Sequence, residues 1–275
     1  MTEGGGVSEP LVRLGVFVSV LVLMAAWEVF SPRRAQAHGR VARWPSNLGI
    51  VVLDSLVVRV LFPAGAVGAA LWAEAQGWGV LRGLGAPAWL AVPVSIVLLD
   101  LAIWAQHVVF HHVPVLWRLH RMHHADTEFD VTTGLRFHPV EIVLSMLIKI
   151  AVVVLLGAPA LAVLLFEVIL NASAMFSHGN VRLPAWLDAT LRRVIVTPDM
   201  HRVHHSAIRE ETDSNYGFCL SVWDRLFGTY RPEPRLGQEG FTIGIETFRD
   251  PAELRLDRLL TQPFRDERPR AQPAE

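Results

Sequence analysis

Five apolar runs divide this chain, and they limit it to a membrane fold. The runs span residues 11–30, 48–72, 88–110, 140–156 and 160–176. About 20 apolar residues allow a helix to cross the hydrocarbon core, and the last two runs lie at the lower limit of that length. With 52% hydrophobic and only 19% charged residues, the chain is too apolar for an ordinary soluble domain. We therefore expect an all-α integral membrane protein with four to five transmembrane helices.

Basic residues predict which side of the membrane each run faces. Four arginines lie between residues 33 and 43, whereas residues 74–87 carry only Arg82 among basic residues. Short loops rich in Lys and Arg stay in the cytoplasm, so we place the first loop there and interpret its arginines as a membrane-surface feature without another role. The end of the third run, the start of the fourth and the end of the fifth then reach the same cytoplasmic face.

The last two runs are predicted to form a helical hairpin. They are separated by Gly-Ala-Pro at residues 157–159, which is a turn signal. Polar residues occur in pairs at equal distances from Ala158, at steps of seven and four residues that keep to one helical face. We predict a polar ladder between the two arms, with an ion pair as its deepest rung. The pairs are His138 with His178, Ser145 with Asn171, and Lys149 with Glu167.

Histidines gather at the ends of these runs. The segments 107–111 (H-V-V-F-H), 120–124 (H-R-M-H-H) and 201–205 (H-R-V-H-H) place imidazoles three or four residues apart, on one face of a helix. Each segment can direct its imidazoles toward one point, and neutral imidazole is a common ligand of zinc, iron and copper. His112 lies roughly 140° around the helix from His107 and is left out. The candidate metal ligands are His107, His111, His120, His123, His124, His138, His178, His201, His204 and His205.

The number of histidines predicts two metal ions, because a tetrahedral zinc site takes only four ligands. Cys219 is the single cysteine, and few carboxylates lie near the histidine segments. Thiolate sites and the Glu-rich di-iron bundles of soluble proteins are therefore disfavoured. Asp100 lies seven residues before His107 on the same face. It is interpreted as a group that orients an imidazole, as a polar group of a substrate channel, or as a helix-end carboxylate.

The order and spacing of the three histidine segments resemble the fatty acid hydroxylase/sterol desaturase superfamily of membrane di-iron enzymes. The later N-Y-G at 215–217 and W-D-R-L-F-G-T-Y at 223–230 match that pattern too. The resemblance covers about residues 50–265. The run T-T-G-L-R-F-H-P-V-E at 132–141 is similar to the branch that contains alkylglycerol monooxygenase.

This resemblance implies an O2-dependent hydroxylase or desaturase with two iron ions, for which zinc can substitute. His107, His111, His120, His123, His124, His201, His204 and His205 would be its catalytic histidines. The implied substrate is an apolar lipid that enters from the bilayer: a sterol, a fatty acyl chain or an ether lipid. No haem, flavin or Rossmann motif occurs, so a cytochrome, ferredoxin or reductase would supply electrons. The net charge of −1 gives no indication of nucleic acid binding.

Two other classes of function remain open. A metal transporter would place ionisable groups through the bilayer, whereas these histidines gather at one face. A zinc-dependent membrane hydrolase would need a carboxylate base, for which Asp126, Glu128 or Asp199 are candidates. We group with this second class a catalytically inactive protein that binds metal or lipid.

We expect three parts along the chain. Residues 1–46 would form an N-terminal helix and basic loop, and residues 47–265 the catalytic membrane domain. Residues 266–275 would be a disordered tail. In the catalytic domain, a cytoplasmic histidine-rich helical cap would hold the di-metal site of this multi-pass protein.

Overall fold

The computed structural model describes residues 9–266, and that part of the chain contains helices and three isolated bridges but no β-strand. Five stretches are long and apolar enough to cross a membrane. They are α1 (Glu9–Phe30), Arg40–Gly83, α5 (Ala88–His112), α7 (Pro139–Leu156) and α8 (Ala160–Ser177). The predicted all-α class with four to five membrane helices is therefore confirmed. Of the tail expected at 266–275, all but Asp266 lies outside the described residues.

The second membrane stretch differs from its prediction as one run over residues 48–72. It consists of α2 (Arg40–Leu61), α3 (Gly65–Ala75) and the short α4 (Val80–Gly83). The break follows from Pro63, which disfavours helical geometry at the residue before it. Phe62 accordingly leaves the helix, with φ −131° and ψ 65°.

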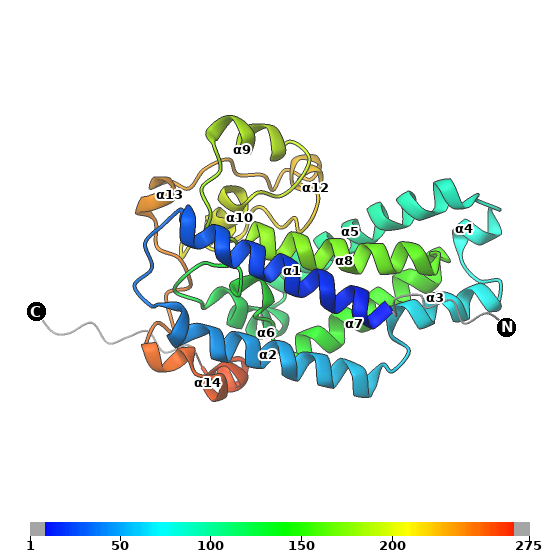
Figure 1. Cartoon of the computed structure of the whole chain (residues 1–275), viewed down its shortest axis with the longest axis horizontal. Helices are drawn as coiled ribbons and strands as arrows, with labels where there is room; N and C mark the ends of the chain where they lie inside the picture. Colours follow the sequence, from blue (N-terminus) through cyan, green and yellow to red (C-terminus); the bar gives the residue numbers. More distant parts are fainter. Residues whose placement is uncertain (1–8, 267–275) are drawn as a thin grey trace, which may run out of the picture.

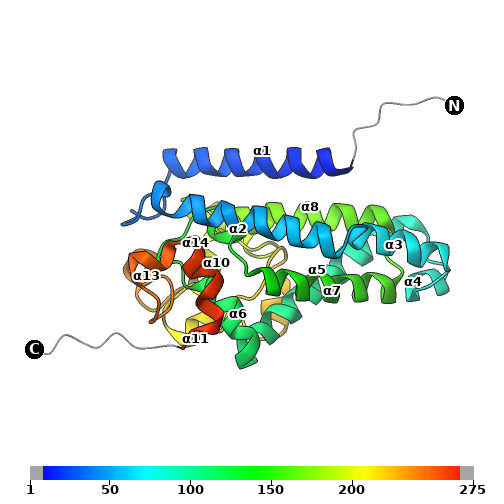
Figure 2. The ribbon, with the colours of Figure 1, turned by 90° about the horizontal axis from the view of Figure 1, so that it is seen from below.

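The long helices run side by side, and the short ones gather mainly at one end of the bundle (Figure 1). That end holds α6 (Pro114–His124), α10 (Pro198–His204), α13 (Gly237–Gly240) and α14 (Leu256–Thr261), while α3 and α4 lie at the opposite end. Figure 2 shows α1 on the outside of the bundle, where it packs against α8. The remaining elements are η1 (Thr133–Leu135), α9 (Ala185–Leu191), α11 (Arg209–Thr212), α12 (Val222–Leu226), η2 (Pro251–Leu254) and η3 (Gln262–Phe264).

The core of the bundle joins α3, α5, α7 and α8. Leu99 of α5, Val153 of α7 and Phe166 of α8 are buried against Ala66 and Ala70 of α3. Small residues let helix backbones approach closely, which is how helices gain contact in lipid, where the hydrophobic effect between them is weak. This packing fixes the directions of the helices that carry the histidines.

The hairpin turn depends on a glycine. Gly157 ends α7 with φ +66°, a left-handed conformation that glycine adopts without strain. A Cβ at this position would also lie 2.7 Å from the carbonyl oxygen of Trp78. The glycine-rich segment 74–87 therefore packs directly on the α7–α8 turn.

The basic segment 33–43 packs against the end of the bundle that holds α6, α10, α13 and α14, which we call the cap (Figure 1). Its interpretation as a membrane-surface feature without another role is therefore wrong. Arg43 is fully buried and binds both carboxylate oxygens of Asp126, at 2.9 and 2.6 Å, and one oxygen of Asp130 at 2.5 Å. Arg33 binds Asp199 at 3.2 Å. Paired charges of this kind can be buried because each replaces the water that the other loses. The arginines therefore attach the N-terminal segment to the cap.

Candidate metal centre

Nine buried imidazoles converge in two groups at the cap end of the bundle. Each histidine offers one ring nitrogen, and within each group all of these nitrogens lie within 4.8 Å of one another. The histidines come from the end of α5, from α6, from the residue that follows α8, and from α10 with the residue after it. The first group is His107, His111, His120, His124 and His204, and the second is His123, His178, His201 and His205.

Each H-x-x-H-H segment is divided between the two groups, so the prediction that each segment points at one site is wrong. His120 and His124 are four residues apart and join the first group, whereas His123 faces the second. Neighbouring residues on a helix point about 100° apart, so adjacent histidines serve different groups. The groups consequently touch: the rings of His124 and His205 are stacked with centroids 4.4 Å apart.

The tautomers of several imidazoles are fixed by what their Nδ1 atoms contact. Nδ1 of His107 lies 2.7 Å from the carbonyl oxygen of Tyr216, and Nδ1 of His204 lies 2.7 Å from that of Ser214. His178 is held in the same way by the carbonyl of Ala174 at 2.8 Å. A carbonyl only accepts hydrogen bonds, so Nδ1 carries the proton and Nε2 carries a lone pair.

Two carboxylates also hold imidazoles through Nδ1. Glu141, at the start of α7, accepts a hydrogen bond from His120 at 2.7 Å, and Asp213 lies 3.3 Å from Nδ1 of His111. Carboxylates in this position are common behind metal-binding histidines, whose ring orientation and basicity they set. Neither carboxylate was among the site residues predicted from sequence. Glu141 lies three residues after His138 in the H-P-V-E run, and that run is the signal that could have found it.

The Nε2 atoms that face one another in the first group form a site suited to a cation. Nε2 of His107 lies 3.0 Å from Nε2 of His120 and 3.1 Å from Nε2 of His204. All three rings donate through Nδ1, so three lone pairs face one another without a proton between them. Such an arrangement is repulsive unless a positive ion lies among the nitrogens.

The second group shows the same crowding around one atom. Nε2 of His178 lies 3.0 to 3.2 Å from Nε2 of His123, His201 and His205. One unprotonated imidazole nitrogen has a single lone pair and cannot accept three hydrogen bonds. A metal ion bound by all four nitrogens would remove this conflict. The donor sets of both groups thus fit the metal that the histidine pattern predicted.

Burial keeps these imidazoles neutral. Desolvation lowers the pKa of His120 to about 3 and that of His178 to about 4, and it lowers the pKa of His201 and His205 well below the usual value. A neutral imidazole is the form that binds metals, so the ligands need not lose a proton at neutral pH.

His138 does not belong to either group, which corrects its prediction as a ligand. It caps the N-terminus of α7, where its Nδ1 accepts a hydrogen bond from the amide of Val140 at 3.2 Å. Its Nε2 lies 3.2 Å from the carbonyl oxygen of Leu260. Both ring nitrogens are therefore occupied. The predicted rung between His138 and His178 is wrong for the same reason.

Asp100 does not orient an imidazole, so that interpretation is also wrong. Its carboxylate accepts hydrogen bonds from the amides of Cys219 and Leu220, at 3.3 and 3.2 Å, and from the indole of Trp223 at 2.8 Å. Asp100 therefore joins α5 to the segment that follows N-Y-G.

A second buried aspartate holds the N-Y-G segment itself. Asp224, from W-D-R-L-F-G-T-Y, accepts hydrogen bonds from the amides of Tyr216 and Gly217 at 2.8 and 2.9 Å. Asn215 adopts a left-handed conformation with φ +51° and donates to the carbonyl of Met200 at 2.9 Å. This geometry aims the carbonyls on either side of Asn215 at two imidazoles of the first group. The two closing motifs thus act together to position His107 and His204.

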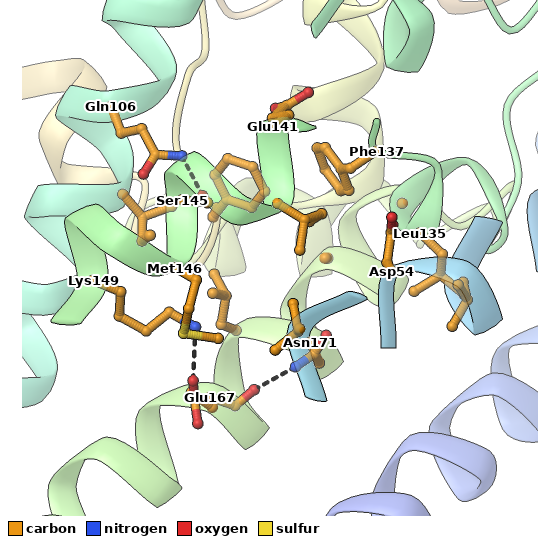
Figure 3. A pocket seen from close by; sticks show the side chains of 18 of the residues that line it. Asp54, Gln106, Leu135, Phe137, Glu141, Ser145, Met146, Lys149, Glu167 and Asn171 are labelled. Carbon is orange, nitrogen blue, oxygen red and sulfur yellow. Dashed lines mark hydrogen bonds and ion pairs between the residues drawn. The ribbon is translucent and has the colours of Figure 1, made fainter. Parts of the chain in front are cut away.

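A cavity of about 470 Å³ adjoins the first group and extends between α1, α2, α5, α7 and α8 (Figure 3). His107 and His120 line one part of it, and Lys149 and Glu167 line another. Apolar side chains such as Met146 form much of the remaining wall. The position of the cavity between membrane helices and its largely apolar wall suit a lipid-like ligand.

The lower rungs of the predicted ladder lie in this cavity. Lys149 Nζ binds Glu167 at 2.7 Å, which confirms the deepest rung (Figure 3). Ser145 and Asn171 both line the cavity, but Ser145 accepts a hydrogen bond from Gln106 and Asn171 donates to the backbone of its own helix. The middle rung is therefore absent. Arg13 of α1 also binds Glu167, at 2.6 Å, and nothing in the spacing of the hairpin pointed to that contact.

A known protein family covers the histidine region of this chain, and known proteins match part of the chain. A family model described as fatty acid hydroxylase matches residues 92–229. An ornithine lipid hydroxylase, OlsE, of Rhizobium tropici is 30% identical over 52% of this chain and 43% of its own length. Human alkylglycerol monooxygenase is 27% identical over 56% of this chain and 34% of its own length. The chain thus spans less than half the length of these relatives, and no solved structure matches it.

The matched residues hold all three histidine segments, His178, the N-Y-G motif and all but the last residue of W-D-R-L-F-G-T-Y. The family model covers half of the chain and includes every imidazole of the two groups. The chain is therefore a multi-pass membrane protein that belongs to the fatty acid hydroxylase family.

Proposed function

We propose that this chain is a membrane lipid hydroxylase whose nine clustered histidines hold two iron ions. The observation that carries the proposal is the set of unprotonated Nε2 atoms of His107, His120 and His204, 3.0 to 3.1 Å apart, beside a cavity between membrane helices. The relatives named for lipid hydroxylation and alkylglycerol oxidation support the same reaction class.

When bound, two irons would supply the oxidation of an unactivated C–H bond by O2. One oxygen atom would enter the C–H bond, and the other would leave as water after two electrons and two protons are supplied. The electrons must come from an external donor, a cytochrome, ferredoxin or reductase. The helices supply a dry site, and Glu141 and Asp213 hold two imidazoles in place.

The histidine groups are proposed to lie on the cytoplasmic side. The arginines of the loop between α1 and α2 favour this orientation, because basic loops stay inside. Arg33 and Arg43 contact the cap directly, so loop and cap share one side of the membrane. The electron donor would then approach from the cytoplasm and the lipid from the bilayer.

The zinc hydrolase alternative has less support. Asp126 is bound to Arg43, Glu128 accepts hydrogen bonds from the amides of Ala37 and His38, and Asp199 binds Arg33. None of these carboxylates belongs to either histidine group. A hydrolase would need one of them free beside the metal to activate water.

Isotope labelling tests the proposal without a known substrate. Cells expressing the wild-type chain or His178→Ala are grown under ¹⁸O2, and their lipid extracts are compared by mass spectrometry. We expect ¹⁸O-labelled lipids only with the wild type, and about two irons per purified wild-type chain. His112→Ala is the matched control, because His112 is exposed and outside both groups. Oxygen derived from water, or one metal per active chain, would refute the proposal.

A further inference from the structure

Four apolar side chains outside the membrane-spanning stretches are exposed near α12. They form what we call the apolar face: Val194, Val222, Leu226 and Phe227, which are 40 to 67% exposed. The amide of Ser221 donates to the carbonyl oxygen of Val194 at 3.0 Å, so the segment that carries Val194 lies beside the start of α12. Exposed apolar surface of this kind marks a contact with a protein or with a membrane.

The apolar face lies beside the part of α5 that crosses the bilayer (Figure 1). The ring of Phe227 stacks on Trp104 of α5, with centroids 4.5 Å apart, and the Trp104 indole donates to Asp224 at 3.0 Å. α5 begins at Ala88, and about 20 residues of a helix cross the hydrocarbon. Trp104 comes sixteen residues after Ala88, so it lies within this crossing stretch. Phe227 therefore packs on α5 at a depth where lipid, rather than water, surrounds the helix.

The backbone around the apolar face is satisfied by protein groups, as a non-helical segment at this depth requires. In the hydrocarbon region no water replaces a missing hydrogen bond, so irregular backbone occurs there only when protein atoms supply the partners. Asp224 accepts hydrogen bonds from two amides of the N-Y-G motif and from the indole of Trp104. Asp100 accepts from the two amides that follow Phe218 and from the indole of Trp223. An aqueous surface would not require these partners, because water could bind the amides.

The residues that border the apolar face are typical of the headgroup level of a bilayer. Trp186 of α9, which lies on the same side of the bundle as α12, is 70% exposed (Figure 1). Arg193, next to Val194, is exposed as well, and Arg225 of α12 donates to the carbonyl oxygen of Arg192 at 2.8 Å. Tryptophan and arginine side chains keep their polar ends at the level where hydrocarbon meets headgroups. These neighbours limit the apolar face to the outer part of one leaflet.

We propose that the apolar face inserts into the leaflet on the cap side, where it forms a membrane contact in addition to the five spanning stretches. The occupant is the lipid of the bilayer, because lipid surrounds α5 at this depth and Phe227 packs directly on that helix. The inference goes beyond the proposed function, and it depends on neither a bound metal nor a reaction.

Spin-label accessibility in lipid nanodiscs tests the proposal on the full chain. A nitroxide is attached to Leu226→Cys, and its relaxation by O2, which concentrates in hydrocarbon, is compared with its relaxation by a water-soluble nickel chelate. We expect the ratio of the two effects to be about fivefold higher in Leu226→Cys than in Leu236→Cys. Leu236 is the matched control, because it is a leucine of similar exposure, 63% against 67%, that precedes α13 at the cap end of the bundle (Figure 1).

The labelled variants must keep the helicity and the melting temperature of the wild type, whose single Cys219 is buried and supplies the background signal. A label at Leu226 that relaxes mainly with the nickel chelate would overturn the proposal. A label that is shielded from both agents and shows spin coupling between chains would assign the face to a second copy of this chain, which would also overturn it.

A fluorescent label on the same two cysteines measures the depth independently. Lipids brominated near the headgroup or near the end of the acyl chain quench a fluorophore that lies at the depth of their bromine atoms. We expect the lipids brominated near the headgroup to quench the label at Leu226 most strongly, and neither lipid to quench the label at Leu236. Absence of quenching at Leu226 would contradict insertion, and strongest quenching by chain-end bromines would contradict a contact limited to the outer part of the leaflet.

Discussion

Glu141 and His120 are joined across two helices by a hydrogen bond of 2.7 Å between Oε1 and Nδ1. The bond fixes the tautomer of His120 so that its Nε2 faces the first histidine group. It also makes α7, which contributes no ligand of its own, part of the metal centre.

Replacing Glu141 should weaken metal binding without unfolding the bundle. Loss of a carboxylate behind a metal-binding histidine typically lowers metal affinity by about 10–100-fold. We expect this loss in Glu141→Leu and a smaller one in Glu141→Gln, whose amide oxygen can still accept a hydrogen bond from Nδ1 of His120. Competition with a chelator measures both affinities. Equal affinity in the leucine variant and the wild type would show that the bond has no role in metal binding.

Gly134 should be intolerant of even one methyl group. A Cβ there would lie 2.6 Å from the carbonyl oxygen of Ala174 and 2.9 Å from Nδ1 of His178. Gly134→Ala must therefore displace the Ala174 carbonyl or His178, the centre of the second group, and we expect the metal content per chain to fall with helicity retained. Gly15→Ala is the control, because nothing lies within 4 Å of that position. Metal analysis and circular dichroism distinguish the outcomes.

The ion pairs of the cavity should respond unequally to substitution. Removing one member of a buried ion pair costs about 3–5 kcal/mol when its partner is left without a counter-charge. Glu167→Gln leaves Lys149 without a counter-charge, while Arg13 keeps its ion pair with Glu9 at 2.8 Å, and should approach that loss. Lys149→Met leaves Glu167 paired with Arg13 and should cost much less. Thermal unfolding in detergent measures the difference.

The contact of Arg13 also changes what the double variant should do. Lys149→Met with Glu167→Gln leaves no unpaired charge, because Arg13 keeps its ion pair with Glu9 at 2.8 Å, so much of the stability should recover. Adding Arg13→Met should restore nothing further, because it removes the partner of Glu9. Equal losses in the two single variants would show that Arg13 does not share the charge of Glu167.

Cysteine labelling tests the orientation of the protein. Ala37 and Gly83 are exposed, at the cap end and at the opposite end of the bundle, and the native Cys219 is buried. A membrane-impermeant thiol reagent should label Ala37→Cys only from the cytoplasmic side and Gly83→Cys only from the other side. Labelling of both from one side would contradict the five-span arrangement.

Sequence patterns predicted the elements that depend on local spacing. Apolar length indicated the membrane helices, and steps of three and four residues identified eight of the nine clustered imidazoles. The equal depth of Lys149 and Glu167 followed from a symmetric turn at Ala158, and the 2.7 Å contact confirms it. Each of these features is determined within one helix or one hairpin.

Features that depend on distant segments could not be predicted in this way. His138 has the same distance from Ala158 as His178, but the chain enters α7 only after it, so His138 caps the helix and turns toward Leu260. The burial of Arg43 needs Asp126 and Asp130, which lie more than eighty residues away. Spacing within a segment carries no information about such partners.

The division of each H-x-x-H-H segment between two sites affects how the centre is assembled. His123 and His124 are adjacent on α6, and His204 and His205 are adjacent where α10 ends, so each of these segments carries histidines of both groups. Neither helix can rotate to improve one site without disturbing the other. In the proposed two-iron centre, the first ion to bind would therefore set the helix rotation that the second ion needs. Metal loading should consequently be cooperative, with partly loaded protein scarce during titration.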